Sequence, residues 1–271
     1  IGEVIGDAIG ARAKKLFITF AYLTLILVVA AFASIVAGTF NGFMTDASGA
    51  LVHNHVNGST ATISLLFIVL AVIFGLLVYR FEMPLGRATL LGVAGIVGVI
   101  ALGLRFPLYA GYDTWMWLLG LYILVASVTP VWILLQPRDY LSSFLLYAMM
   151  LAAVVGIVAA HPVIELPAFT SFEVNGQYLF PALFVTVACG AISGFHSLVA
   201  SGTTSKQLSS ERDARLVGFG SMLIESALGI ASLIAVGYIF TQNGHAFTSQ
   251  TPTQVLADGL SQMLALSLIH I

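Results

Sequence analysis

The chain has 271 residues, of which 59% are hydrophobic and only 8% are charged, and its formal net charge is −2. A soluble domain carries roughly 25% charged residues, so this chain is too poor in charge to cover a surface that faces water. The small net charge gives no indication of nucleic acid or of any strongly charged partner. The single cysteine, Cys189, excludes an internal disulfide and a cysteine-based metal cluster.

The apolar runs predict a set of transmembrane helices. In lipid every backbone N–H and C=O needs a partner within the protein, which leaves helices or closed barrels. The runs are continuous rather than alternating, so we expect an all-α integral membrane protein in which residues 1–271 form one transmembrane domain. A span takes about 20 apolar residues. Seven segments qualify: about 16–37, 62–79, 88–104, 114–135, 141–160, 179–199 and 217–240.

The positions of the basic residues agree with seven crossings. Nine of the ten Lys and Arg residues fall on one set of flanks and loops, and Arg105 alone falls on the other. Cytoplasmic loops carry an excess of Lys and Arg, so we expect the N-terminal side to be cytoplasmic and the region after Phe240 to lie outside. The outside loops, 38–61 and 161–178, contain no basic residue. The nine are Arg12, Lys14, Lys15, Arg80, Arg87, Arg138, Lys206, Arg212 and Arg215.

Two ionisable residues at membrane depth carry the functional hypothesis. Glu225 lies ten residues after Arg215 in the seventh span, roughly 15 Å from the cytoplasmic edge at 1.5 Å per residue. A carboxylate there is costly and marks a proton or substrate site more often than a structural hydrogen bond. His196 exchanges protons near neutral pH, although a neutral histidine bonded to a carbonyl would explain it nearly as well.

Small residues around His196 predict a discontinuous helix near residues 190–204. Ser193 and Gly194 give the sixth span little bulk, which permits close packing or a break. Ser201, Gly202, Thr203 and Thr204 follow and make a poor continuation of a span. Unwound segments of this kind bind carboxylates at helix N-termini and cations at carbonyls. A plain cytoplasmic turn would explain the same residues equally well.

A tight loop is expected between the fourth and fifth spans. Pro137 is predicted to end one helix and Asp139 to cap the next, with Arg138 beside it at the cytoplasmic edge. An ion pair in a loop explains these residues, and an arginine gate for an anionic substrate is the second choice. Motifs for zinc hydrolysis, serine nucleophiles and phosphate loops are absent from the sequence, so we expect no enzyme and no cofactor.

At these residues the sequence resembles the carbon starvation protein A family of bacterial membrane transporters. Three stretches in the same order carry the resemblance across most of the chain: 188–196 (ACGAISGFH) running into 201–204 (SGTT); 130–132 (PVW) through 137–141 (PRDYL); and 213–215 (DAR), Gly218 and Gly220, ending in 222–226 (MLIES). Ser205 stands where the family usually has proline, which loosens the local turn. Residues 266–271 do not look like the family's continuation.

The resemblance implies a secondary transporter of the amino-acid/polyamine/organocation type, with an inverted repeat, in the bacterial cytoplasmic membrane. It implies uptake of pyruvate, or of short peptides, during carbon limitation. It also implies a longer parent protein with further helices on both sides, of which this chain is a fragment. The coupling ion stays open between H⁺ and Na⁺.

We therefore hypothesise a proton-coupled transporter for a small carboxylate, with pyruvate before short peptides. His196 and Glu225 would share the proton, and Thr203 and Thr204 would offer hydroxyls to the substrate or ion. A nutrient receptor that binds without transport is the alternative from another class. A channel is the third option. The acid and the histidine near the midplane argue only weakly against it.

Overall fold

The computed structural model consists almost entirely of helices. It describes residues 1–45, 49–169, 171–174, 176–185, 187, 196, 199–242 and 252–269. The chain divides into two compact units, an N-terminal unit (Gly2–Leu146) and a C-terminal unit (Tyr147–Ile271), which are described separately. The expectation of an all-α multi-pass membrane protein is confirmed, whereas the single domain stays a prediction.

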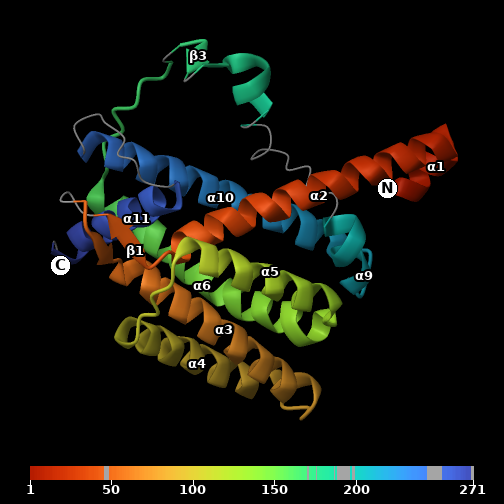
Figure 1. The fold of residues 1–271 in the computed structure, drawn as a ribbon, viewed down its shortest axis with the longest axis horizontal. Helices are drawn as coiled ribbons and strands as arrows, with labels where there is room; N and C mark the ends of the chain where they lie inside the picture. Colours follow the sequence, from red (N-terminus) through yellow and green to blue (C-terminus); the bar gives the residue numbers. More distant parts are fainter. Residues whose placement is uncertain are drawn as a thin grey trace. The chain divides into compact units, whose positions relative to one another are not determined.

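The N-terminal unit contains five long helices, one short helix and a strand pair (Figure 1). A two-stranded antiparallel sheet pairs Met44 with Val52. The elements are α1 (Gly2–Ile9), α2 (Ala11–Phe40), β1 (Phe43–Thr45), β2 (Leu51–His53), α3 (His55–Tyr79), α4 (Leu85–Arg105), α5 (Tyr112–Val128) and the first part of α6 (Val131–Ala160).

Helices α3 and α4 lie side by side because glycines on α4 leave room for side chains of α3. A Cβ at Gly95 would meet a methyl carbon of Leu70 at 2.6 Å, and one at Gly92 would meet the ring of Phe74 at 3.1 Å. Phe74 also stacks on Tyr140 of α6, with ring centroids 5.5 Å apart. Small residues that let backbones approach are the usual device of helix packing in membranes.

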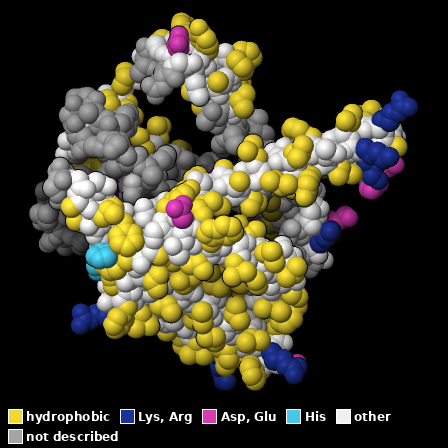
Figure 2. Space-filling model, in the orientation of Figure 1, with side chains coloured by type: hydrophobic (Ala, Val, Ile, Leu, Met, Phe, Trp, Pro, Cys, Tyr) yellow, Lys and Arg dark blue, Asp and Glu magenta, His cyan; other side chains and the backbone are white. Residues whose placement is uncertain are grey.

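A second cluster joins α2, α3 and α5 around Trp115, which is 1% exposed. Phe40 meets the indole edge to face at a centroid distance of 5.2 Å. Nearby, β2 brings the ring of His53 against that of Tyr109, with centroids 4.3 Å apart and planes tilted by 38°. Hydrophobic side chains cover the visible face over α3, α4 and α5, while Lys and Arg lie at its edges (Figure 2). This distribution suits a surface in contact with lipid.

The C-terminal unit is organised around the second half of α6, α10 (Asp213–Gln242) and α11 (Pro252–Ile269). Its core contains Ala235 and Met263, both fully buried. A Cβ at Gly259 would lie 2.7 Å from the carbonyl oxygen of Ala235, so α10 and α11 touch backbone to backbone. The remaining elements are β3 (Glu173–Val174), β4 (Gln177–Tyr178), η1 (Leu179–Leu183), η2 (Ala200–Thr204) and α9 (Ser205–Gln207).

Four of the seven predicted spans correspond to single long helices, namely α2, α3, α4 and α10. Among the described residues, five helices are long and apolar enough to cross a membrane, α6 being the fifth, and α5 is apolar but has 17 residues. The predicted span 179–199 falls mostly outside the described residues. The count of seven crossings stays a prediction.

The loop predicted around Pro137 is wrong. The chain turns instead at Thr129, whose extended ψ of 133° precedes Pro130, and α6 then runs unbroken through Pro137. A residue before proline is pushed out of the helical region, so Pro130 ends α5. Pro137 is accommodated inside α6 because Gly75 of α3 faces its ring, where a Cβ would come within 2.7 Å of Cγ. Asp139 therefore caps nothing and lies within the helix.

Candidate functional site

The predicted proton-sharing residues lie close together in the C-terminal unit. His196 Nε2 and Glu225 Oε2 are 3.7 Å apart, within ion-pair range when the imidazole is protonated. Glu225 lies in the middle of α10, twelve residues after Asp213, or about 18 Å along the helix. The side chains are 58% and 49% exposed, so each is accessible from outside the described fold. In hydrocarbon an acid so placed has to be paired, protonated or in contact with water.

The hydroxyl residues after His196 form a wide helical turn. Residues 200–204 make the π-helix η2, in which the N–H of Ser205 reaches back to the carbonyl of Ala200. The hydroxyl of Ser205 donates to the carbonyl of Ser201 at 3.2 Å. Thr203 and Thr204 are half-buried, whereas Ser201 and Gly202 are exposed. Single π-turns occur often at functional sites.

Residues 199–207 are therefore helical, and the unwound segment expected at 201–204 is wrong. Helix α9 ends at Gln207, and Leu208 after it has an extended ψ of 131°, so helical structure continues beyond the predicted end of the span at 199. Ser193 and Gly194 lie outside the described residues. Their predicted role in a helix break stays a prediction.

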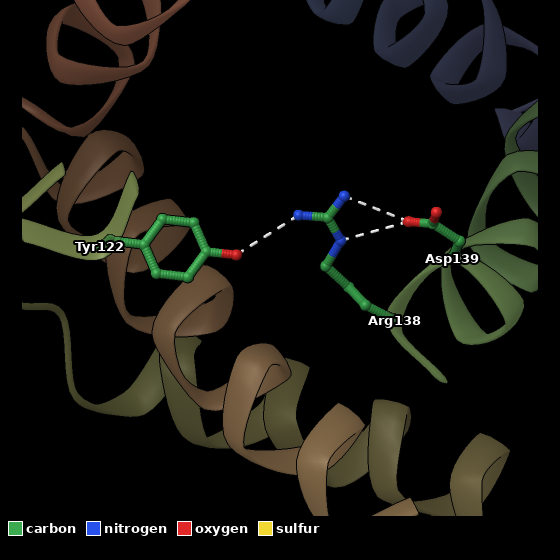
Figure 3. Close-up of polar contacts among 3 residues, drawn as sticks. All are labelled: Tyr122, Arg138 and Asp139. Atoms are coloured by element: carbon green, nitrogen blue, oxygen red, sulfur yellow. Dashed lines mark hydrogen bonds and ion pairs between the residues drawn. The ribbon is translucent and has the colours of Figure 1, made fainter. Parts of the chain in front are cut away.

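Arg138 lies well inside α6 and not at the cytoplasmic edge of a loop. It is seven residues from Val131, about 10 Å along the helix axis. Its Nε and Nη2 donate to Oδ1 of Asp139 at 3.2 and 3.1 Å, and its Nη1 donates to the hydroxyl of Tyr122 on α5 at 3.4 Å. The guanidinium thus lies between a carboxylate on one side and a phenol on the other (Figure 3).

A cavity of about 440 Å³ opens beside this arginine between α2, α3, α5 and α6. We call it the Arg138 cavity. Aliphatic and aromatic side chains make most of its wall, among them Phe40, Ile68 and Leu118. Among the described residues that line it, Arg138 is the only charged one. The other polar side chains among these lining residues are those of Tyr122, Trp115 and two serines.

The sequence alone did not identify Tyr122 or Trp115 as site residues. Tyr122 on α5 contacts Arg138 on α6, and the two residues are sixteen positions apart in the chain. No local sequence pattern predicts this pairing. The indole Nε1 of Trp115 is buried, and it has no hydrogen-bond partner in the part of the chain that the structure describes. A signal for both existed in the aromatic run at the start of α5, where Trp115, Trp117 and Tyr122 are interleaved with leucines. Such residues read equally well as an interfacial belt.

The two groups of polar residues offer different chemistry. The imidazole of His196 and the carboxylate of Glu225 are both groups that can take up and release a proton. Arg138 is a fixed cation that binds carboxylates through paired N–H groups. Within the described residues, no group of three His, Cys, Asp or Glu side chains is placed to hold a metal ion.

Comparison with known proteins relates the sequence of the chain to one family. The sequence model of the family described as "Carbon starvation protein CstA" matches residues 1–267. A peptide transporter CstA of Mycobacterium tuberculosis is 39% identical over 178 residues, which cover 59% of this chain and 23% of that protein. A peptide transporter CstA of Helicobacter pylori is 49% identical over 139 residues, covering 49% and 20%. The pyruvate/proton symporter BtsT of Escherichia coli is 44% identical over 137 residues, covering 48% and 19%.

The matched regions span about a fifth to a quarter of the length of these curated relatives. The relatives are named as transporters and not as enzymes. No solved structure matches the chain.

Proposed function

Because the chain belongs to the carbon starvation protein CstA family, we propose that it forms part of a secondary active transporter that takes up a small carboxylate or short peptides. Pyruvate is the first candidate substrate, since a relative is named a pyruvate/proton symporter, and peptides are the second. We place the protein in the bacterial cytoplasmic membrane with the N-terminal side of the chain in the cytoplasm, on the excess of basic residues there.

The observation that carries the proposal is the contact between His196 and Glu225 of α10, a helix long and apolar enough to cross a membrane. At 3.7 Å the two groups are close enough to share one proton in the proposed cycle, as an ion pair or as a neutral pair in which Glu225 holds the proton. Taking up one more proton gives a cationic form with both groups protonated. A cycle between these forms carries a proton across the midplane without leaving a lone carboxylate in lipid.

The wide turn of η2 supplies the second part of the proposal. It follows His196 by four residues, and its hydroxyls belong to Ser201, Thr203 and Thr204. Hydroxyls donate to carboxylates and also accept contacts from Na⁺ through oxygen, so this turn suits a small anionic substrate or a coupling cation. Gly202 keeps one side of the turn free of bulk. The substrate would then bind close in sequence to the proton carrier, which would allow binding and protonation to influence each other.

Uptake by the full-length parent protein in proteoliposomes tests this function. Labelled pyruvate should accumulate when the outside is made acidic, and Glu225→Gln should abolish the response to the proton gradient while preserving expression and folding. Glu211→Gln is the matched control, because Glu211 lies before α10 and outside the predicted span. Unchanged gradient-driven uptake in Glu225→Gln would remove this residue from the mechanism.

The same experiment separates the alternatives. Accumulation driven by a Na⁺ gradient and indifferent to pH would replace the proton with Na⁺ as coupling ion. Accumulation of labelled dipeptides without pyruvate would make peptides the substrate. Saturable binding with no accumulation under either gradient would overturn the transporter and favour a receptor.

A further inference from the structure

We propose that the Arg138 cavity binds an organic monoanion with a large apolar body, of the fatty-acid type, with its carboxylate against the guanidinium. The cavity belongs to the N-terminal unit, whereas His196 and Glu225 belong to the C-terminal unit. The inference therefore concerns a second site and does not depend on the proposed proton pathway.

The cavity is too large and too apolar for a three-carbon oxoacid. Its 440 Å³ lies in the range of about 300–1,000 Å³ that holds drug-sized ligands. Its wall is built from side chains such as Ile68, Leu118 and Leu119. Burying a hydrocarbon chain against such a wall is favourable, whereas a small polar acid would leave most of the wall without a partner.

The charge on the cavity wall selects an anion. Arg138 is the only charged side chain among the described lining residues, and its carboxylate neighbour Asp139 is not part of the lining. Asp139 takes the guanidinium edge that carries Nε and Nη2, while Nη1 is directed to Tyr122, which lines the cavity. Figure 3 shows the guanidinium held between the two groups.

The guanidinium retains donor capacity for a ligand. It has five N–H groups, of which three serve the contacts to Asp139 and Tyr122. The hydroxyl of Tyr122 accepts from Nη1 and can donate its own hydrogen to a carboxylate. A ligand carboxylate beside Tyr122 would thus meet one cationic and one neutral donor, both supplied by residues already in contact.

The charged group on the described part of the cavity wall lies beside Tyr122. Trp115 and Tyr122 both line the cavity and are seven residues apart on α5, which is about 10 Å. At the Trp115 end the wall includes Phe40, whose ring meets the indole at 5.2 Å. The polar head of an amphiphile would therefore lie at Arg138 and its hydrocarbon tail would extend toward Trp115. A peptide fits less well, because few polar groups on this wall could pair its backbone amides.

Photolabelling of the full-length parent protein in phosphatidylcholine nanodiscs tests the inference. The probe is decanoate with a diazirine at the end of its chain, and labelled peptides are identified by mass spectrometry. We expect label on the cavity-lining parts of α3 or α5, displaced by unlabelled decanoate but not by decanol or pyruvate. Displacement by decanol as effective as by decanoate, or label confined to other parts of the protein, would overturn the inference.

Two variants examine the head and the tail separately. R138Q/D139N removes both charges together, so no carboxylate is left unpaired. It should lower labelling about tenfold or more, because the ligand loses a charge-assisted hydrogen bond. L119W adds an indole to the cavity wall with both charges kept and should also lower labelling. Arg87→Gln, on α4 and not among the lining residues, is the control. If R138Q/D139N does not fold, L119W decides: full labelling in L119W overturns the inference.

Discussion

The contact between α3 and α4 gives a quantitative test of the fold through two glycines of one helix. Gly103 is buried, and a Cβ there would lie 3.1 Å from the backbone nitrogen of Ile63 and closer still to its side chain. Gly98 lies five residues away on α4, and a Cβ there would meet nothing within 4 Å. Replacing each glycine by alanine adds the same methyl group to the same helix, so the difference between the variants isolates the contact.

The expected magnitudes follow from that difference. Alanine in place of glycine favours a helix by about 1 kcal/mol, and this gain applies at both positions. Overpacking a close contact costs about 1–3 kcal/mol, and this cost applies only at Gly103, where the side chain of Ile63 can move but its backbone nitrogen cannot. Gly98→Ala should therefore be neutral or stabilising, and Gly103→Ala should be less stable than Gly98→Ala by about 1–3 kcal/mol.

The free energy of unfolding of the full-length protein, measured by titration with a denaturing detergent in mixed micelles, provides the comparison. Circular dichroism checks that both variants keep the helix content of the parent. Equal stability of the two variants, or a more stable Gly103→Ala, would refute the packing of α3 against α4 described above.

Two further predictions concern other parts of the N-terminal unit. Trp115→Phe removes the buried indole N–H that has no partner among the described residues. An unpaired buried N–H costs about 1–3 kcal/mol, so the free energy of unfolding should stay the same or rise. A clear loss of stability would show that the indole N–H is paired. Lys14 hydrogen-bonds Glu3 at 2.6 Å and attracts it electrostatically, which lowers the pKa of Glu3. A lowered carboxyl pKa adds stability that is fully present above about pH 4.3 and is lost as the pH falls through the folded-state pKa, so Glu3→Gln should speed amide exchange in α1 at pH 7, by a factor that shrinks on acidification.

Length and hydropathy were enough to predict the long helices from the sequence. The runs within α2, α3, α4 and α10 each exceed the thickness of the hydrocarbon, and their composition leaves no competing structure in lipid. The ends were less predictable. Helix α2 begins at Ala11 and so includes Arg12, Lys14 and Lys15, which the charge pattern had placed before the helix. Long basic side chains extend toward water from within a helix, so charge marks the membrane edge better than the helix end.

The prolines between α5 and α6 could not be told apart from local sequence. Pro130 follows Thr129 and Pro137 follows Gln136, and both preceding residues tolerate an extended conformation. Either proline could therefore end a helix. The choice was made by packing, because Gly75 on α3 accepts the ring of Pro137. A residue 62 positions away in the chain decided the boundary, and such information appears only once the helices are assembled.

The candidate site was predictable to the extent that its residues were unusual for lipid. Glu225 and His196 stood out as ionisable groups at membrane depth, and the structure brings them within 3.7 Å although 29 positions separate them. Tyr122 was not predicted, because a tyrosine in a transmembrane helix is common and its partner was assigned to a loop. Because the sequence predicted a loop around Pro137, it also gave no indication of the Arg138 cavity.

Moving Arg138 from a loop into α6 changes two arguments together. The turn between α5 and α6 consists of Thr129 and Pro130 and carries no basic residue. Without Arg138, eight of the ten Lys and Arg residues fall on the expected cytoplasmic side, and Arg105 falls on the other. That excess still predicts a cytoplasmic N-terminal side. An arginine about 10 Å inside a helix, however, is no longer explained by topology. Its ion pair with Asp139 offsets the charge and its hydrogen bond to Tyr122 sets its direction, so the photolabelling measures whether its remaining N–H groups bind a carboxylate.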